Sequence, residues 1–231
     1  MPAKSGPLRP HEERASYARP LPREPLPGEP ELGDSFLIVT EGDVTERMYF
    51  DSIRKLNRAK VMVVHPPCTD ALGLIEMAKS LRDKTGDRDN PGYDHVWVLF
   101  DTDVPSRDGK LGAAMAMALQ EGIHVGHSTP SVETWLYLHF RDRPGAFMDS
   151  DRAERAVSEA WRESYDKSAE TFGRLWPDLQ PNISAAVRRA MEVRRYHQNS
   201  GTPFPANPST EVDLLVRALD VSVRRERRII R

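Results

Sequence analysis

Two short apolar segments of the chain end in carboxylates. Residues 36–40 are followed by Glu41, and residues 96–100 are followed by Asp101 and Asp103. Both segments have the length and apolarity of buried strands, and open parallel sheets place their sites just beyond the carboxyl ends of their strands. If the two strands are neighbours, the three carboxylates converge and repel one another unless a cation neutralises them. Hard oxygen ligands of this kind prefer Mg²⁺ or Mn²⁺, so the sequence predicts a metal site suited to phosphate chemistry.

The spacing within each motif adds detail. Asp101 and Asp103 are two residues apart at a strand end, so their carboxylates are expected to point the same way and share one divalent ion. Gly42 follows Glu41, and a glycine there permits a tight turn and the close approach of a phosphate to the backbone. The alternative is that these acids are solvated loop residues that cap helices.

Other polar residues could complete such a site. Ser128 and the free N–H groups of the helix that follows could hold a phosphate oxygen, and Glu133 could orient a water or a second metal. Glu133 in a first helical turn could equally stabilise the helix N-terminus. Lys167 could neutralise charge that develops on a phosphate, although a surface lysine is the simpler interpretation. Thr45 and Glu46 could also belong to the site, although a capping residue and a favourable charge at a helix start explain them more simply.

The charge of the chain is unevenly distributed. The formal net charge is -2, but residues 188–231 contain ten arginines and five acidic residues. This local excess could meet a polyanion such as nucleic acid, although half of these arginines lie in the last eight residues, where a solvated chain end is the more usual explanation. The candidate contacts recur at helical spacing, although a solvated helix face explains them equally well. They are Arg188, Arg189, Arg194 and Arg195.

The composition excludes several kinds of site. The single cysteine, Cys68, excludes an intramolecular disulfide and a cysteine-rich zinc site, which is consistent with a reducing compartment. No apolar stretch approaches membrane-spanning length, and the N-terminus lacks the apolar core of a signal peptide. We therefore expect a cytoplasmic protein without membrane contact.

The pattern of the chain predicts three parts. Residues 1–34 contain eight prolines and almost no apolar periodicity, which predicts a disordered leader. In residues 35–145, short apolar runs alternate with amphipathic stretches, which predicts an α/β domain with a mostly parallel central sheet flanked by helices. Residues 146–231 predict a C-terminal helical extension packed on or beside that domain.

The expected elements can be placed along the chain. A helix is expected after Pro130, with Ser131 as its N-cap, and Pro177 and Pro181 are expected to separate two later helices. The strands are expected at 36–40, 61–65, 95–100 and 123–127, and the other helices at 44–58, 70–84, 110–121, 151–173, 182–197 and 209–223.

Three ordered motifs carry a family resemblance. They are Glu41-Gly-Asp-Val-Thr-Glu46 with Tyr49-Phe50, then Val96-Trp-Val-Leu-Phe-Asp101-Thr-Asp103, then Ser128-Thr-Pro-Ser-Val-Glu133-Thr-Trp135 with Leu138-His139-Phe140. Together they resemble the RloB-like family, whose members are associated with restriction and phage-defence loci.

The resemblance implies a Toprim-like, Rossmannoid domain. It implies that Glu41 acts as general acid or base and that Asp101 and Asp103 hold Mg²⁺. The family pattern usually reads Ser-Asn-Pro with an aromatic residue before the glutamate, whereas this chain has Thr129 and Val132 at those places. This departure leaves the role of Thr129 open.

Three functions are compatible with these residues. The first is a Mg²⁺-dependent phosphodiesterase that acts on DNA or RNA in phage defence. The second is a non-hydrolytic module that binds nucleic acid or a nucleotide and regulates a defence partner encoded nearby. The third is a phosphatase of the haloacid dehalogenase type, in which Asp101 is the nucleophile.

Overall fold

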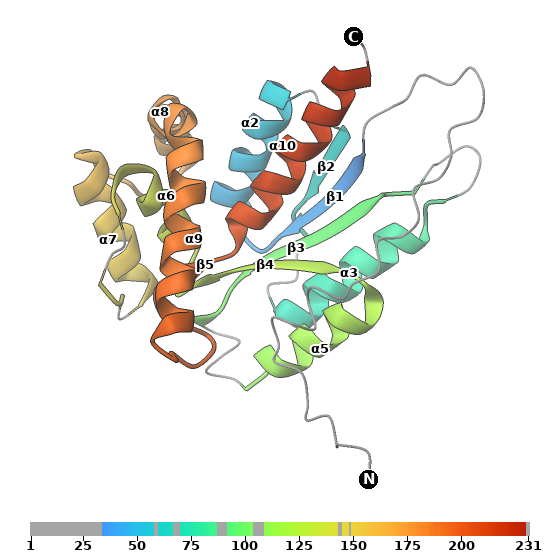
Figure 1. Ribbon diagram of the computed structural model, residues 1–231, viewed down its shortest axis with the longest axis horizontal. Helices are drawn as coiled ribbons and strands as arrows, with labels where there is room; N and C mark the ends of the chain where they lie inside the picture. The colour runs from blue at the N-terminus through green and yellow to red at the C-terminus, as the bar shows by residue number, and fades with distance from the viewer. Residues whose placement is uncertain are drawn as a thin grey trace. The chain divides into compact units, whose positions relative to one another are not determined.

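The computed structural model of the chain is built around a five-stranded β-sheet (Figure 1). It describes residues 34–57, 60–66, 70–86, 92–103, 109–142, 145–147 and 149–229, with side chains as far as residue 220. The expected leader up to residue 33, Cys68 and the arginines from position 224 onward therefore lie outside the described side chains. Among the described helices, none combines the length and apolarity needed to cross a membrane.

Strands and helices alternate along the first half of the described chain, as predicted. The strands are β1 (Ser35–Thr40), β2 (Lys60–Val64), β3 (His95–Asp101), β4 (His124–Thr129) and β5 (Ser209–Thr210). The helices are α2 (Thr45–Asn57), α3 (Ala71–Asp83), α5 (Leu111–Glu121), α6 (Glu133–Phe140), α7 (Ser150–Trp161), α8 (Ala169–Leu179), α9 (Ile183–Asn199) and α10 (Val212–Ile229), with a 3-10 turn η1 (Gln180–Asn182). The α/β class and the mostly parallel sheet flanked by helices are confirmed.

The sheet has the order β2-β1-β3-β4-β5. The first four strands pair in parallel and β5 pairs antiparallel with β4. The chain passes from β1 to β2 on one side and then crosses to β3 on the other side of β1. Such a reversal of strand order opens a crevice at the carboxyl ends of the two strands involved. The predicted site residues follow β1 and β3, which are these two strands.

Each face of the sheet is covered by its own apolar cluster. Phe36 and Ile38 of β1 point to the face covered by α2 and α10, whereas Leu37 and Val39 point to the face covered by α3 and α5 (Figure 1). This alternation follows from the two-residue period of a strand. Burial of an apolar side chain on either face contributes about 1.5–3 kcal/mol, so the register of the strands is firmly set.

The helices of the second half pack on the first of these clusters. Trp135 of α6, Leu175 of α8 and Leu215 of α10 are fully buried and belong to the same cluster as Phe36. Helices α6 to α9 gather beyond the end of the sheet (Figure 1). Residues on both sides of position 145 therefore share one core.

The expected helix over 151–173 is wrong, because two helices occupy this stretch. Helix α7 ends at Trp161, where Arg162 takes a left-handed conformation with φ 69°. Helix α8 begins only after Ser168, whose side chain accepts a hydrogen bond from the Thr171 N–H. Pro177 lies inside α8 instead of separating two helices. The apolar periodicity did not predict this break, because the left-handed residue at the end of a helix is usually glycine and here it is arginine.

Two other local expectations are corrected. Ser131 does not cap α6: the N-cap position is Val132, and the Ser131 hydroxyl instead donates to the Glu133 carboxylate at 2.6 Å. The helix expected from 209 begins at Val212, because residues 209–210 form β5. A two-residue strand is too short to show a period in the sequence.

Candidate active site

The ends of β1 and β3 are joined by Glu41. Its backbone N–H donates to the Leu99 carbonyl at 3.0 Å, and its Oε2 accepts from the Asp101 N–H at 2.8 Å. The glutamate that follows one strand is thus bound to the backbone of the next. The two acidic motifs therefore meet at the carboxyl ends of β1 and β3.

Asp101 is the last residue of β3, so the alternation of the strand sets the direction of its side chain. Asp101 continues the row of Trp97 and Leu99, so it points to the side of α2 and α6. Loss of solvation raises the pKa of Asp101 well above its usual range, and Glu46, Glu133 and Glu41 raise it further. This crowding of like charges is what a cation would relieve.

Glu41 lies just past the end of β1, and its carboxylate reaches across to the backbone of β3. Burial raises its pKa, the hydrogen bond from the Asp101 N–H opposes that rise, and the charges of Asp103 and Asp70 add to it. Glu41 therefore interacts with the charges of Asp103 and Asp70, and it acts in turn on Asp101 and Glu46.

Asp103 lies beyond the end of its strand. Strand β3 ends at Asp101, so the direction of Asp103 is set by its contacts and not by strand alternation. Its Oδ2 accepts from the Ser150 hydroxyl at the start of α7 at 2.7 Å. Joint binding of one ion by Asp101 and Asp103 remains a prediction.

Gly42 leaves space for the carboxylate of Glu46. The Glu46 side chain is buried and its Oε1 accepts from the Gly42 N–H at 3.1 Å. A Cβ added at Gly42 would lie 1.9 Å from Glu46 Oε2. Burial raises the pKa of Glu46 to about 7, with further contributions from Glu133 and Glu41. The spacing of glycine and glutamate four residues apart is the sequence signal for this contact.

Glu133 is fully buried and is surrounded by donors. Its Oε2 accepts from the Ser131 hydroxyl, and its Oε1 lies 3.2 Å from the Tyr165 hydroxyl and 3.3 Å from Lys167 Nζ. The Tyr165 hydroxyl also lies 2.7 Å from Thr45 Oγ1 at the start of α2. Thr45 therefore belongs to this buried network, in which Tyr165 connects the starts of α2 and α6.

Lys167 is brought to the site from the segment between α7 and α8. Its backbone is left-handed, with φ 59°, a conformation that costs a residue with a side chain about 1–2 kcal/mol. Its Nζ also lies 3.7 Å from Glu154 Oε2. Burial alone would lower the pKa of Lys167, but Glu133, Asp101 and Glu154 outweigh that effect and raise it.

The Ser128 hydroxyl already has a hydrogen-bond partner within the sheet. It lies 2.9 Å from Thr210 Oγ1 of β5, and both residues are buried. Thr129 lies beside it, with its hydroxyl 2.8 Å from Thr102 Oγ1. A phosphate contact of Ser128 remains a prediction and would require this hydroxyl to exchange partners.

The four arginines of α9 fall into two kinds. Arg189 pairs with Asp142 and donates to the Leu138 and His139 carbonyls, and Arg194 pairs with the buried Asp213. Arg188 and Arg195 are exposed, and Arg188 lies 3.8 Å from a glutamate one turn later. The predicted binding of nucleic acid is thus open to Arg188 and Arg195, whereas the other two hold helices together.

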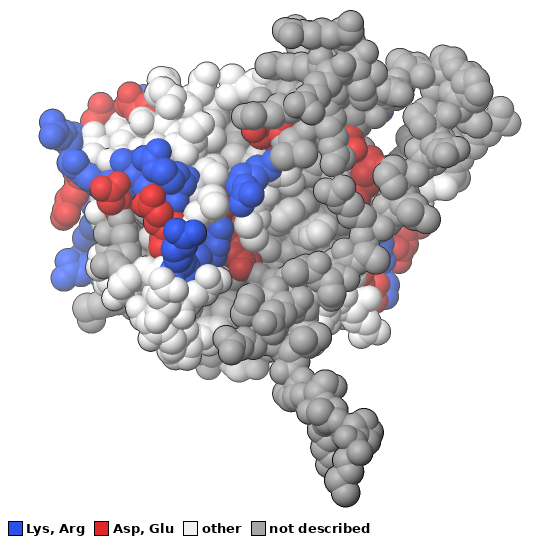
Figure 2. All heavy atoms as spheres, viewed as in Figure 1, with Lys and Arg blue, Asp and Glu red and all other residues white. Residues whose placement is uncertain are grey.

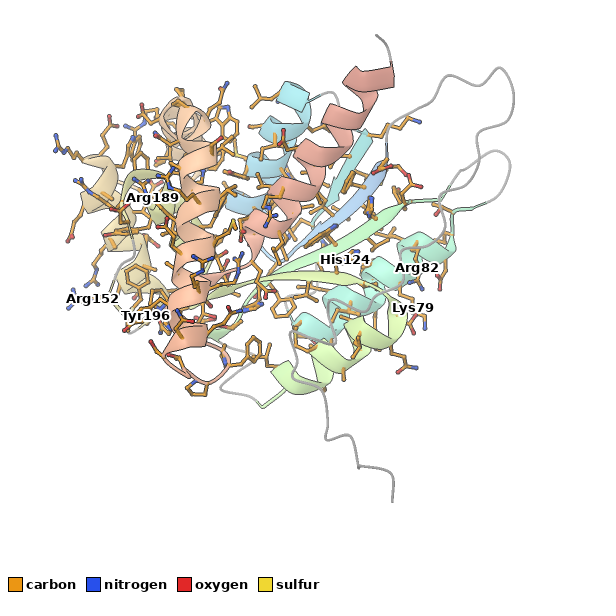
Figure 3. The ribbon with its side chains drawn as sticks, in the orientation of Figure 1. Lys79, Arg82, His124, Arg152, Arg189 and Tyr196 are labelled. Atoms are coloured by element: carbon orange, nitrogen blue, oxygen red, sulfur yellow. The ribbon has the colours of Figure 1, made fainter. Side chains whose placement is uncertain are left out.

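Further basic residues lie on α7. Figure 2 shows Lys and Arg side chains gathered over α7 and α9 with acidic side chains between them, and Figure 3 places Arg152 on α7 and Arg189 on α9. A cavity of about 300 Å³ lies at α7, lined by Phe147, Arg152, Arg155 and Glu159 with two alanines. Arg152 and Arg155 form no ion pair within the described residues.

The carboxylates at the ends of β1 and β3 are oxygen ligands that suit a divalent cation. Within the part of the chain that the structure describes, no three His, Cys, Asp or Glu side chains are arranged to hold a metal ion. Mg²⁺, however, usually keeps several waters and needs only one or two protein carboxylates together with phosphates of its substrate. The crowded carboxylates of Glu41 and Asp101 fit that requirement, with Asp103 beside Glu41.

The sequence identified the strand-end acids, Glu133 and Lys167, and the structure brings these into one neighbourhood. It does not bring Arg189 or Arg194 there, and no local sequence pattern assigns Tyr165 or Ser131 to the site. Among the curated proteins and the solved structures, none matches the chain. A family model described as "RloB-like protein" matches residues 36–219, which extend from the second residue of β1 into the first half of α10. The chain therefore belongs to the RloB-like protein family.

Proposed function

We propose that this protein is a Mg²⁺-dependent phosphodiesterase that cleaves nucleic acid. The observation that carries the proposal is the meeting of Glu41, Asp101 and Lys167 at the reversal of strand order between β1 and β3. Open α/β sheets bind their ligands at this place. Carboxylates that attract a cation, next to a lysine that attracts a phosphate, are suited to phosphoryl chemistry.

Each residue has a role in this proposal. Glu41, Asp101 and Asp103 hold the ion, and Mg²⁺ would supply polarisation of the scissile phosphate and stabilisation of the leaving oxygen. Lys167 offsets the negative charge that develops on the phosphate in the transition state. Glu133 holds Lys167 in place, and Glu41 is the general acid or base that the family resemblance implies.

The wider context is part of the same proposal. Membership of the RloB-like family supports a role in phage defence, and the strand order with acids after β1 and β3 supports a Toprim-like arrangement. The exposed basic residues of α7 and α9 are the proposed contacts for the substrate backbone. Contacts of this kind are electrostatic, so binding should weaken steeply as salt is raised.

The test compares Asp101→Asn with Asp51→Asn. Asp51 is a surface residue of α2 that pairs with Arg54, so it controls for the loss of a carboxylate elsewhere. Both variants and the wild type are incubated with single-stranded and duplex DNA and RNA in Mg²⁺, Mn²⁺ or EDTA. We expect metal-dependent cleavage by the wild type and by Asp51→Asn, and loss of cleavage in Asp101→Asn with an unchanged circular dichroism spectrum.

Other outcomes select other functions. Mg²⁺-tightened binding of a nucleotide without any product would favour the non-hydrolytic regulatory module. Transfer of phosphate to Asp101 would favour the phosphatase. Cleavage retained in Asp101→Asn refutes the assignment of this site.

A further inference from the structure

We propose that a base of the substrate stacks on Phe204, and that the substrate is therefore single-stranded nucleic acid. This inference rests on the proposed function and specifies its substrate class. Phe204 lies in the loop that joins α9 to β5 (Figure 1). Its ring is exposed, is held by a loop that is bound to the rest of the chain, and lies close to the strand ends that carry the acids.

Phe204 is the most exposed large apolar side chain in the part of the chain that the structure describes. It is 55% exposed, although it lies between two prolines, whose rings restrict the backbone. Further along the loop, the Asn207 side chain donates to the Phe147 carbonyl at 2.7 Å and accepts from the Phe147 N–H at 3.1 Å. An aromatic ring that is already held in place loses little conformational entropy when a ligand binds.

The ring packs at the carboxyl end of β4. Its centroid lies 5.1 Å from that of the buried His127 ring, with an angle of 81° between the two planes. The next residue of β4, Ser128, pairs in register with Asp101 of β3. Neighbouring strands lie about 4.8 Å apart, so the ring is on the order of 10 Å from the backbone of Asp101. A base on Phe204 would belong to a nucleotide near the phosphate at the acids.

A basic cavity adjoins the same loop. Phe147, to which Asn207 is bound, lines the cavity of about 300 Å³ at α7. The charged part of the lining is two arginines and one glutamate, and within the described residues neither Arg152 nor Arg155 forms an ion pair. Proteins that bind single strands combine positive charge for the phosphates with aromatic rings for the bases. The loop therefore connects the two parts that such a site needs.

The chemistry of the ring selects single strands. A phenyl ring has no hydrogen-bonding group with which to bind the edge of a base, so Phe204 can bind only the face of a base. In a duplex, the faces of each base are covered by its neighbours in the stack. A base is free to stack on Phe204 only where the strand is unpaired, so we expect single strands to bind more tightly than duplexes.

The experiment measures binding by fluorescence anisotropy in EDTA, so that no metal-dependent cleavage occurs. The probes are fluorescein-labelled oligothymidylate and oligouridylate, the duplex of oligothymidylate with oligoadenylate, and an abasic strand of the same length, which keeps the phosphates but has no bases. The variants are Phe204→Ala, Phe204→Leu and Phe204→Trp. The control is Leu119→Ala, which removes a 43% exposed apolar side chain from α5, near the amino end of β4.

We expect Phe204→Ala to weaken binding of the single strands about 5- to 150-fold, which is the loss of one stacked base, and to leave binding of the abasic strand unchanged. Phe204→Leu keeps an apolar side chain against His127 but has no ring, so it guards against misfolding and should also bind the single strands more weakly than the wild type. Phe204→Trp and Leu119→Ala should bind the single strands at least as tightly as the wild type. All variants should have the urea midpoint of the wild type.

The outcomes separate this inference from the function. Equal weakening of the base-bearing and abasic strands in Phe204→Ala, or no weakening of either, overturns the role of Phe204 while leaving metal-dependent cleavage by the wild type intact. Tighter binding of the duplex than of the single strands overturns the substrate class. Base-dependent weakening in a protein that cleaves nothing in Mg²⁺ upholds the stacking role and refutes the nuclease instead. No saturable binding of any probe, together with no cleavage, overturns both.

Discussion

Substitution of Gly42 by alanine is the sharpest test of the packing around the acids. The added Cβ would lie 1.9 Å from Glu46 Oε2 and 2.6 Å from its Cδ, so the Glu46 carboxylate must leave its place. The move breaks the hydrogen bond from the Gly42 N–H, which is worth about 1–3 kcal/mol when the acceptor is buried. An off-rotamer side chain adds about 0.5–1.5 kcal/mol. We expect Gly42→Ala to lower the free energy of unfolding by about 2–4 kcal/mol.

The assay is urea denaturation of four proteins: the wild type, Gly42→Ala, Glu46→Ala and the double variant. In the Glu46→Ala background the added methyl group has room, so Gly42→Ala should cost no more than about 0.5 kcal/mol there. The coupling energy of the cycle should then be about 2–3 kcal/mol. By thermal melting, Gly42→Ala alone should lower Tm by roughly 5–15 °C for a domain of this size.

Gly112 provides the matched control. Gly112 is a residue of helix α5, and a Cβ added there would have no neighbouring atom within 4 Å. Gly112→Ala should raise the free energy of unfolding by about 0.5–1 kcal/mol, because alanine favours a helix over glycine. Equal effects of Gly42→Ala in both backgrounds would refute the contact between Gly42 and Glu46.

Three further predictions concern buried polar groups. Burial lowers the pKa of His139 to about 4, so below about pH 6.5 the unfolded chain takes up a proton that the folded protein does not bind. The free energy of unfolding should therefore fall by about 3 kcal/mol from pH 6.5 to 4. His139→Gln should flatten this slope in urea titrations. Arg194→Met leaves the buried Asp213 without its ion-pair partner and should lower the free energy of unfolding by about 3–5 kcal/mol. The second change Asp213→Leu should restore most of this loss. No recovery in the double variant would contradict the pairing. Tyr165→Phe removes a hydrogen bond to Glu133 and should lower the unfolding free energy by about 1.5–3 kcal/mol, whereas an unchanged urea midpoint would show that the hydroxyl is not needed.

The strand ends could be predicted from the sequence because each one combines two strong signals. An apolar run of strand length is followed by an acidic residue, and this transition marks where the chain leaves the core. The expected strand at 95–100 differs by one residue from β3. Glu41 and Asp101 were found because parallel strands bring their carboxyl ends to one edge of the sheet, a property of the fold class that needs no knowledge of individual contacts.

The partners of the acids could not be predicted in the same way. Tyr165 reaches Thr45 across 120 residues, and no local pattern encodes a contact at that separation. Arg189 and Arg194 share helical spacing with Arg188 and Arg195, yet their ion pairs depend on where α6 and α10 pack. The left-handed Arg162, which ends α7, is likewise fixed by packing and not by its residue type.

The connection between Thr45 and Tyr165 also bears on how the protein is made. At about 5–20 residues per second, a ribosome needs on the order of 10 s to extend the chain from one residue to the other. Throughout that interval a nascent chain can form β1 and α2 but has no Tyr165 to bind Glu133 and no Lys167 to neutralise it. Translation itself therefore delays assembly of the acidic network, and a chain cut short before residue 165 would leave Glu133 without two of its partners.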